Sequence, residues 1–345
     1  MEQALLVAAR TQSSTQTMQA MVYESYGPIE QLQLREIPRP SPRADEVLVR
    51  VQAAALHVGD VFAVRGQPYL MRVVTGLLRP KSGIPGFDVC GVVGSVGAEV
   101  SRFKAGDRVF GASMGTCAEL VSVKATALAH APERLSAAQA AGLATSGVPA
   151  LVALRDVAKL QPGSKLLING AAGGVGTFAI QIAKTMGAEV TAVCSSQRRA
   201  LMLELGADHV IDYNQVDFTR AAERYDVIFD NVENHPLEAC RRALTPRGML
   251  ILNSGVGEDG LALWVRLLKP LFLSPLSKQT YRRFVTMPQQ KELEALAGLV
   301  TSGVLTPVVG KTFPLSETAR ALAYIASGHA LGKTVIEITS SPTRA

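Results

Sequence analysis

The fold is decided by Lys165-Leu-Leu-Ile-Asn-Gly170-Ala-Ala-Gly173-Gly174-Val-Gly176, an apolar run that leads into a glycine-rich turn. A helical pattern follows over Thr177 to Met186, and a second apolar run begins at Glu189. In this strand, helix, strand context the turn predicts a dinucleotide site, because glycines let the backbone approach a pyrophosphate and a helix N-terminus stabilises its charge. The alternative is a tight structural turn. The expected cofactor contacts are Gly170, Ala171, Ala172, Gly173, Gly174, Val175 and Gly176.

The end of the second apolar run bears on which dinucleotide binds. An Asp or Glu there would accept hydrogen bonds from the adenosine 2′-hydroxyl, but this chain reads Cys-Ser-Ser-Gln-Arg-Arg over 194–199. Two hydroxyls and two guanidinium groups suit a 2′-phosphate, so we expect NADP(H) rather than NAD(H). The alternative is that the arginines only coat a solvated helix start. The expected phosphate contacts are Ser195, Ser196, Arg198 and Arg199.

The pattern along the chain predicts an α/β fold with two domains. Residues 18–140 carry alternating strand-like runs punctuated by Pro and Gly, which indicates a β-rich, barrel-like domain. Residues 141–286 alternate short buried strands with helices, which predicts a doubly wound parallel sheet of Rossmann type. Residues 287–345 form a C-terminal segment with a helix over Lys291 to Ser302 and a last strand over Val335 to Ile338. The strands expected in the Rossmann part are Lys165–Asn169, Glu189–Cys194, His209–Ile211, Asp226–Asp230 and Met249–Asn253.

Composition and charge exclude several classes of protein. With 345 residues, 48% hydrophobic and 19% charged, the chain is globular rather than disordered. The net charge of +6 is spread along the chain with few aromatics nearby, so nucleic-acid binding is not expected and a phosphate-bearing small ligand explains the excess equally well. Residues 1–17 predict a disordered extension, with an organellar address as the alternative. No apolar run of about 18 residues predicts a membrane span, and we expect a cytoplasmic protein.

The four cysteines are widely separated along the chain. None forms a paired C-x-x-C spacing, so neither a disulfide framework nor a compact zinc knuckle is expected. They are Cys90, Cys117, Cys194 and Cys240.

Three further motifs make a family resemblance specific. They are Gly86-Phe-Asp88-Val-Cys-Gly91-Val-Val-Gly-Ser-Val-Gly97, Phe103-Lys-Ala-Gly106-Asp107-Arg-Val109 and Leu331-Gly332-Lys333-Thr334-Val335. With the glycine-rich turn, they make the sequence from Met18 to Ile338 resemble the quinone oxidoreductase branch of the medium-chain dehydrogenase/reductase superfamily. The resemblance implies a GroES-like catalytic domain, built from the N-terminal part and the C-terminal segment, with a Rossmann domain between them and the active site in the cleft.

The resemblance also bears on metal binding. The zinc-dependent alcohol dehydrogenase branch holds catalytic zinc at positions that match His57, Phe87 and Thr145 here. Only one of these side chains is a usual ligand, whereas catalytic zinc needs three protein ligands. The four-cysteine structural zinc lobe of that branch is also missing. We therefore expect no metal, and without a Lewis acid the oxidation of simple alcohols loses its usual physical basis.

A bound nicotinamide could then give a hydride to an electrophile that needs little acid activation, such as a quinone or a conjugated enone. Tyr69 and His57 are the residues expected near a substrate oxygen; a rim tyrosine and a structural histidine are the alternatives. A metal-free carbonyl reductase or alcohol dehydrogenase, and a non-catalytic NADP(H)-binding module, are the other functions that remain open. Further cofactor contacts implied by the resemblance, each with a structural loop role as its alternative, are Tyr213, Asn231, Asn253, Ser254, Gly255 and Lys333.

Residues 261–283 are the least family-typical stretch, with Trp264, several leucines and interspersed cations. Such a composition suits a peripheral membrane contact. We favour a lid over the substrate cleft or a contact with a second subunit, because Pro270 and Pro275 break any long amphipathic helix. A homodimer is expected from the resemblance alone.

Overall fold

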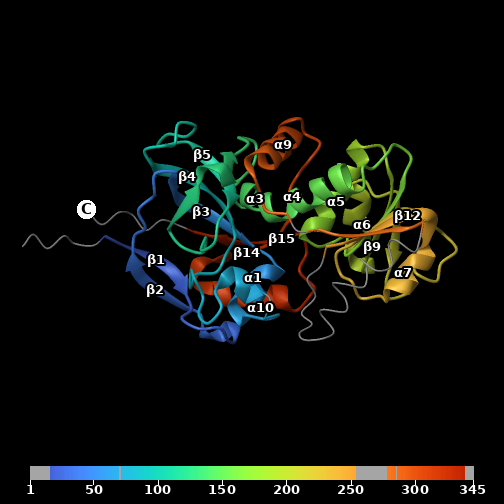
Figure 1. The fold of residues 1–345 in the computed structure, drawn as a ribbon, viewed down its shortest axis with the longest axis horizontal. Helices are drawn as coiled ribbons and strands as arrows, with labels where there is room; N and C mark the ends of the chain where they lie inside the picture. Colours follow the sequence, from blue (N-terminus) through green and yellow to red (C-terminus); the bar gives the residue numbers. More distant parts are fainter. Residues whose placement is uncertain (1–15, 70, 254–277, 285, 339–345) are drawn as a thin grey trace, which may run out of the picture.

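Two large β-sheets lie one after the other along the long axis of the molecule in the computed structural model, and a small third sheet accompanies them (Figure 1). The structure describes residues 16–69, 71–253, 278–284 and 286–338. Ser254, Gly255 and most of the 261–283 segment lie outside these residues. Thr17 corrects the predicted extension, because it begins a strand and pairs with Pro38 in a two-stranded antiparallel sheet; residues 1–15 of the predicted extension are not described. The strands of this small sheet are β1 (Thr17–Val22) and β2 (Gln33–Pro38).

The larger sheet combines strands from both ends of the chain. Its order is β14-β15-β3-β4-β5-β7, with β6 paired to β3. The C-terminal strand β15 runs antiparallel to β3, with Val335 opposite Ala55. The C-terminal segment thereby completes the β-rich domain, as a GroES-like arrangement requires. The strands are β3 (Glu46–Leu56), β4 (Asp88–Val96), β5 (Arg108–Ala112), β6 (Leu120–Lys124), β7 (Leu128–His130), β14 (Val309–Pro314) and β15 (Lys333–Glu337).

The second sheet is parallel throughout and has the order β10-β9-β8-β11-β12-β13. Its first strand along the chain, β8, lies in the interior, and the order reverses between β8 and β11. In sheets of this kind the crevice at that reversal is where dinucleotides bind. The strands are β8 (Lys165–Asn169), β9 (Glu189–Cys194), β10 (His209–Asp212), β11 (Tyr225–Asp230), β12 (Leu244–Leu252) and β13 (Thr280–Arg283).

Alternate residues of the parallel strands point to opposite faces, and each face has its own apolar cover. In β8, Ile168 packs in the core cluster that contains Phe178 of α5 (Gly174–Thr185). Leu167 faces the other way, into the cluster that contains Cys240 of α7 (Leu237–Ala243). Burial on both faces explains why these strands are continuous apolar runs rather than alternating ones.

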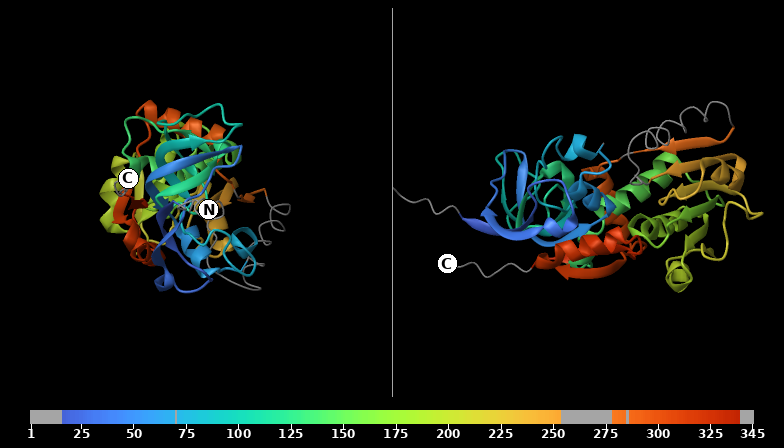
Figure 2. Two further views of the ribbon diagram at one scale, coloured as in Figure 1. Left: turned by 90° about the vertical axis from the view of Figure 1, so that its left-hand side faces the viewer. Right: turned by 90° about the horizontal axis from the view of Figure 1, so that it is seen from below.

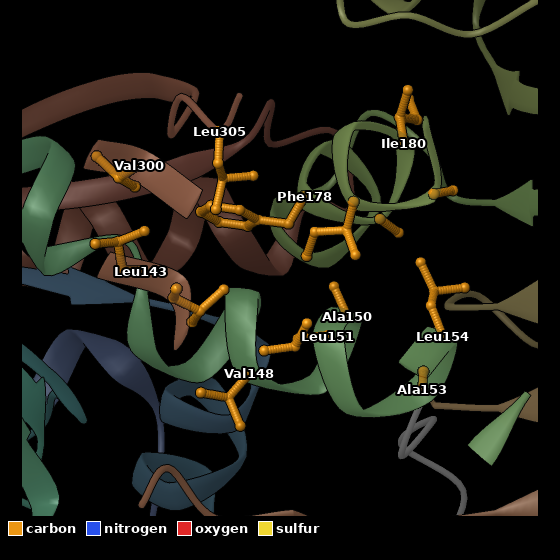
Figure 3. Close-up of a cluster of buried hydrophobic side chains, with 14 of the residues drawn as sticks. Leu143, Val148, Ala150, Leu151, Ala153, Leu154, Phe178, Ile180, Val300 and Leu305 are labelled. Carbon is orange, nitrogen blue, oxygen red and sulfur yellow. The ribbon is translucent and has the colours of Figure 1, made fainter. Parts of the chain in front are cut away.

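The two sheets share one apolar core at their junction. Three helices meet there: α4 (Ala144–Val152), α5 and α9 (Gln290–Thr301) (Figure 3). Val148, Phe178 and Val300 pack in the same cluster as Ala55 of β3 and Ile168 of β8. A continuous core of this kind holds the two domains in a fixed relation.

The remaining helices are short and lie around the β-rich domain. Among the described residues, none is long and apolar enough to cross a membrane. The helices around the β-rich domain are α1 (Val58–Arg65), α2 (Met71–Thr75), α3 (Ala137–Ala141) and α10 (Thr318–Ala326). A further short helix, α6 (Arg199–Glu204), follows β9 in the second domain.

Candidate functional site

The glycine-rich turn lies between β8 and α5, at the point where the strand order reverses. Gly170 has a φ of +74°, a conformation that other residues adopt only with strain. A Cβ on Gly176 would lie 2.4 Å from the carbonyl oxygen of Gly170 and 2.5 Å from that of Ala171, so glycine is required for the helix to pack against the strand. These two glycines shape the turn itself.

Gly173 has a different part, because its surroundings are open. A Cβ built there meets only the Gly170 carbonyl oxygen, at 3.4 Å. Gly173 is also the N-cap residue of α5, where the helix presents unpaired N–H groups and its positive end. The turn therefore offers a bare backbone and a favourable field to a pyrophosphate. Ala171 is buried, whereas Ala172, Gly174 and Val175 are partly accessible.

Lys333 lies beneath this turn, in a buried polar cluster. Its Nζ lies 2.9 Å from Oδ2 of Asp88 and 3.1 Å from Oγ of Ser146, and its side chain is 1% exposed. Asp88 accepts two further hydrogen bonds, from the backbone N–H and the hydroxyl of Thr145. The lysine is thus held by a carboxylate rather than directed over the turn. A Cβ on Gly174 would lie 3.2 Å from Cδ of Lys333.

The C-terminal segment also contacts the turn through its backbone. The N–H of Gly332 donates to the carbonyl oxygen of Ala172 at 2.8 Å, and Gly332 forms a parallel bridge with Gly173. The β-rich domain is therefore fastened to the turn by a main-chain bridge, while the buried ion pair joins two strands of that domain, β15 and β4, next to the turn. Sequence reasoning did not single out Asp88 or Ser146; an acidic residue at the first position of a buried strand was the available signal, because such a charge needs a partner.

The predicted 2′-phosphate contacts surround the carboxyl end of β9. Ser195 and Arg198 are half-buried, and Arg199 is exposed. The Arg199 guanidinium donates to the carbonyl oxygen of Val210 at 3.0 Å, which tethers it to β10. Arg198 is therefore the cation better placed to meet a ligand phosphate.

Asp212 is a neighbour of this group that sequence reasoning missed. It pairs with Cys194 across β10 and β9, and its carboxylate accepts hydrogen bonds from the backbone and side chain of Asn214 and from Ser196. These hydrogen bonds lower the pKa of Asp212, and the bond from the Asn214 N–H has the largest effect. Ser196 thus donates to a carboxylate, and its contact with a ligand phosphate stays a prediction. The signal was the position of Asp212 at the end of the third parallel strand, beside the end of the second.

Tyr213 follows directly and is 51% exposed. Its N–H donates to the carbonyl oxygen of Cys194 at 3.2 Å, so its ring starts from the same sheet edge as the serines. Its backbone is fixed and its side chain is accessible to a ligand.

A polar ladder crosses the carboxyl ends of the central strands. The Asn253 side-chain amide donates to Oδ1 of Asn231 at 2.8 Å, and the Asn231 amide donates to the carbonyl oxygen of Asn169. The side chain of Asn169 in turn donates to Asp230 at 2.8 Å. Asn231 and Asn253, both expected as cofactor contacts, are thus brought together and oriented by hydrogen bonds.

His57 precedes α1 in the β-rich domain, and its ring stacks on Phe87 with centroids 5.4 Å apart. Its backbone N–H donates to Oδ2 of Asp60 at 2.8 Å, while Oδ1 of Asp60 accepts the N–H of Gly86 at 2.9 Å. Asp60 is fully buried, and burial raises its pKa. Asp60 therefore fixes two loops together, and 28% of the His57 side chain remains accessible.

Tyr69, the other expected catalytic residue, lies on the loop after α1 and is 59% exposed. The guanidinium carbon of Arg72 lies 4.9 Å from its ring centroid, a cation–π contact. Tyr69 is thus a rim residue whose ring is packed under a cation. A rim position was one of the two expected readings of this residue, and it leaves the hydroxyl accessible.

Two of the three positions that match zinc ligands in related enzymes, Phe87 and Thr145, carry side chains that are not usual zinc ligands. Phe87 offers an aromatic ring, which stacks on His57, and the hydroxyl of Thr145 donates to Asp88 at 2.6 Å. Among the described residues, no group of three or more His, Cys, Asp or Glu side chains is arranged to hold a metal ion.

Comparisons with known proteins agree with this architecture. An alcohol dehydrogenase GroES-like domain model matches residues 43–150, and a zinc-binding dehydrogenase model matches residues 205–336. The chloroplast envelope quinone oxidoreductase homolog of Arabidopsis thaliana is 30% identical over 339 residues, covering 93% of this chain and 98% of that protein. The chloroplastic NADPH-dependent alkenal/one oxidoreductase of the same plant is 30% identical over 338 residues, covering 92% and 79%. The solved quinone oxidoreductase of Coxiella burnetii superposes with a TM-score of 0.82 at 28% identity, covering 94% and 100%.

Proposed function

Because this chain belongs to the medium-chain dehydrogenase/reductase superfamily, in its quinone oxidoreductase-like branch, we propose that it reduces quinones or α,β-unsaturated carbonyl compounds with NADPH and without a metal ion. Membership makes it an NAD(P)H-dependent oxidoreductase that acts on small molecules. The observation that carries the finer proposal is the set His57, Phe87 and Thr145, which supplies one metal donor where catalytic zinc needs three.

The cofactor part of the proposal is supported by the shape of the glycine-rich turn. When bound, NADPH supplies the hydride, and the chain supplies binding and orientation. The open backbone at Gly173 and the N-terminus of α5 would hold the pyrophosphate. The ladder of Asn231 and Asn253 would orient the ring at the strand ends, where their side chains are already joined.

The preference for NADPH over NADH is supported by Arg198 and Ser195, which lie at the carboxyl end of β9. Asp212 opposes that preference, because an ionised carboxylate repels a phosphate. We expect NADPH to bind better than NADH, because two cations, Arg198 and Arg199, follow the same strand.

The substrate part of the proposal assigns work to residues of the β-rich domain. His57 and Tyr69, both accessible, would donate hydrogen bonds to the substrate oxygen as negative charge develops on it. A quinone or an enone needs only such donors, whereas a simple alcohol would need a Lewis acid to lower its pKa. Asp60 would keep the His57 loop in place rather than transfer protons.

The test is a panel of acceptors with both cofactors. NADPH and NADH oxidation is followed at the nicotinamide absorbance band with a short-chain quinone, an enone, an aldehyde and no acceptor, in the presence and absence of a chelator. We expect turnover with NADPH on the quinone or enone, unchanged by the chelator. The matched control is Gly173→Ala, which keeps every acid, base and hydroxyl of the site. It should lower turnover, because it weakens NADPH binding at the turn.

Other outcomes would assign other functions. Turnover with the aldehyde alone would favour a metal-free carbonyl reductase, and turnover that the chelator abolishes would overturn the metal-free proposal. Tight NADPH binding with no turnover on any acceptor would favour a binding module. A cytoplasmic location and a homodimer are further proposals, tested by cell fractionation and by sedimentation of the purified chain. A lid, subunit or membrane role for residues 261–283 also stays a proposal, tested by deleting 261–276.

A further inference from the structure

A surface of the β-rich domain combines exposed apolar side chains with exposed cations. Between Asp60 and Asp88 the sequence contains four cations and no acidic residue. Two of these cations, Arg79 and Lys81, are exposed next to a pair of leucines. We call this the apolar cationic surface, and its members are Tyr69, Val73, Leu77, Leu78, Arg79 and Lys81.

The apolar members are unusually open to solvent. Leu78 is 91% exposed, the highest value among the large apolar side chains of the described residues, and Leu77 is 70% exposed. Val73 and Tyr69 are 62% and 59% exposed. Single exposed apolar residues need no explanation, but four within ten residues of sequence indicate a surface that meets something apolar.

The segment is firmly held from its inner side, so the exposure does not come from a loose loop. The Tyr26 hydroxyl bonds to Oγ1 of Thr75 at 2.8 Å and donates to the carbonyl oxygen of Gly76. Arg72 stacks on the Tyr26 ring at 4.5 Å and donates to the carbonyl oxygen of Gly66. The polar groups of the segment thus bind inward, and its leucines are left facing outward.

The backbone of the turn reinforces this arrangement. The N–H of Lys81 donates to the carbonyl oxygen of Thr75 at 2.7 Å, which closes a tight loop over Leu77 and Leu78. A Cβ on Gly76 would lie 2.1 Å from the carbonyl oxygen of Arg79, so the loop is closely packed on itself. Its apolar side chains are therefore presented on a fixed support. In Figure 2 the light-blue part of the chain, which contains α1, lies at the outer edge of the molecule, near the junction of the two domains.

We propose that the apolar cationic surface binds the surface of an anionic lipid bilayer. Leu77 and Leu78 would enter the interface, and Arg79 and Lys81 would meet the lipid phosphates. A second copy of this chain is the less favourable occupant, because a two-fold contact would bring the same cations face to face. This proposal does not depend on the reaction that the protein catalyses.

A bilayer contact here would also bring the β-rich domain, with its proposed substrate-binding residues, next to apolar molecules dissolved in the membrane. Tyr69 belongs both to the surface and to the residues expected near a substrate oxygen, and α1 begins directly after His57. A lipid-dissolved electrophile would then pass from the membrane to the site with little exposure to water. This second step rests on the proposed function, whereas binding to the bilayer does not.

The test is co-sedimentation of the full chain with lipid vesicles. Vesicles of phosphatidylcholine with about 30% phosphatidylserine are compared with phosphatidylcholine alone, at low and high salt. We expect binding to the anionic vesicles only, and weakening by salt, because the cations act through screened charges. Leu77→Ser with Leu78→Ser, and separately Arg79→Gln with Lys81→Gln, should each reduce partitioning by about tenfold or more.

Matched controls separate this surface from general stickiness and from misfolding. Leu34→Ser with Leu203→Ser changes two leucines that are 40% and 43% exposed elsewhere, and Lys104→Gln with Lys124→Gln removes two exposed cations of the same domain. Both control pairs should bind vesicles like the parent chain. Each variant is also checked for its thermal transition and for NADPH binding, which the surface should not affect.

Several results would overturn the proposal. These are absence of binding to anionic vesicles, equal binding to neutral ones, and binding that survives both surface variants. A change of oligomeric state on Leu77→Ser with Leu78→Ser, without an effect on vesicle binding, would assign the surface to a second copy instead. If the parent chain binds anionic vesicles but shows no NADPH turnover on any acceptor, the proposed function is rejected and the membrane contact stands.

Discussion

Nζ of Lys333 lies 2.9 Å from Oδ2 of Asp88, and the two residues are 245 positions apart in the chain. Both side chains are buried, at 1% and 0% exposure. The pair joins the last strand of the β-rich domain to the first residue of β4, directly beneath the glycine-rich turn. Two charges removed from water in this way depend on each other.

Removing one member of this pair should cost more than removing both. Lys333→Met leaves the Asp88 carboxylate buried with only the Thr145 hydrogen bonds, and we expect a loss of about 3–5 kcal/mol in the free energy of unfolding. Lys333→Met with Asp88→Asn should lose less than the sum of the single changes. Urea unfolding measures all three, with the exposed Lys104→Met as the control. Additive losses would contradict a coupled pair.

Two glycines of the turn should respond differently to the same substitution. Gly173→Ala adds a Cβ with no contact closer than 3.4 Å, so the fold should keep its thermal transition while NADPH binding falls by about tenfold or more. Gly176→Ala places a Cβ 2.4 Å from a carbonyl oxygen and should lower the thermal transition itself. Calorimetry and cofactor fluorescence distinguish the two effects. Normal NADPH binding by Gly173→Ala would move the pyrophosphate away from this turn.

Arg198→Ala should change the choice of cofactor. If Arg198 meets the 2′-phosphate, the loss is about 1.5–3 kcal/mol for NADPH and close to none for NADH, the usual range for a hydrogen bond to a charged group. Titration calorimetry with both cofactors measures the difference. Arg220→Ala, whose side chain is 83% exposed in the same domain, is the control. Equal weakening of both cofactors would reject the assignment.

Asp212→Asn should act in the opposite direction. Hydrogen bonds lower the pKa of Asp212, so its carboxylate is ionised at neutral pH beside the predicted phosphate contacts. Removing a partly accessible charge of this kind should tighten NADPH relative to NADH by about two- to fivefold, and by less at high salt. An unchanged ratio of the two dissociation constants would place the phosphate away from Asp212.

The four cysteines should be unreactive in the folded protein. All are buried, and burial raises the pKa of Cys90 to about 11 and that of Cys240 to about 12. Since the thiolate is the reactive form, little of it is present at pH 8. A chromogenic disulfide reagent should detect no fast thiol in the native protein and four after denaturation. A fast native thiol would show that one of these sites opens.

The strands that could be predicted are those whose own sequence decides them. β8 and β9 agree residue for residue with the expected ranges, because each is a short apolar run with clear flanks. β13 was not expected, because Thr280–Arg283 is polar apart from Tyr281 and pairs only because β12 lies beside it. β12 begins at Leu244 rather than Met249, because Leu244 pairs with Tyr225 of β11; Pro246 and Gly248 lie in the irregularity before regular pairing starts at Met249, the predicted first residue.

The same distinction holds for the candidate site. The glycine-rich turn could be predicted because its geometry is local and needs particular residues at fixed spacing. Asp212 and Asp88 could not, because their meaning depends on Ser196 and Lys333, which the fold brings to them. Lys333 itself was singled out, but its buried partner depends on a contact between distant parts of the chain.

The pairing of β15 with β3 has a consequence for how the protein is made. On the ribosome, β3 emerges early, and its partner β15 emerges only after the whole parallel sheet. The parallel sheet between them is contiguous in sequence and can close while the nascent chain is still growing. Until β15 is made, the second half of β3 has one edge without a strand to pair with. We therefore expect this edge to be what a chaperone protects during synthesis.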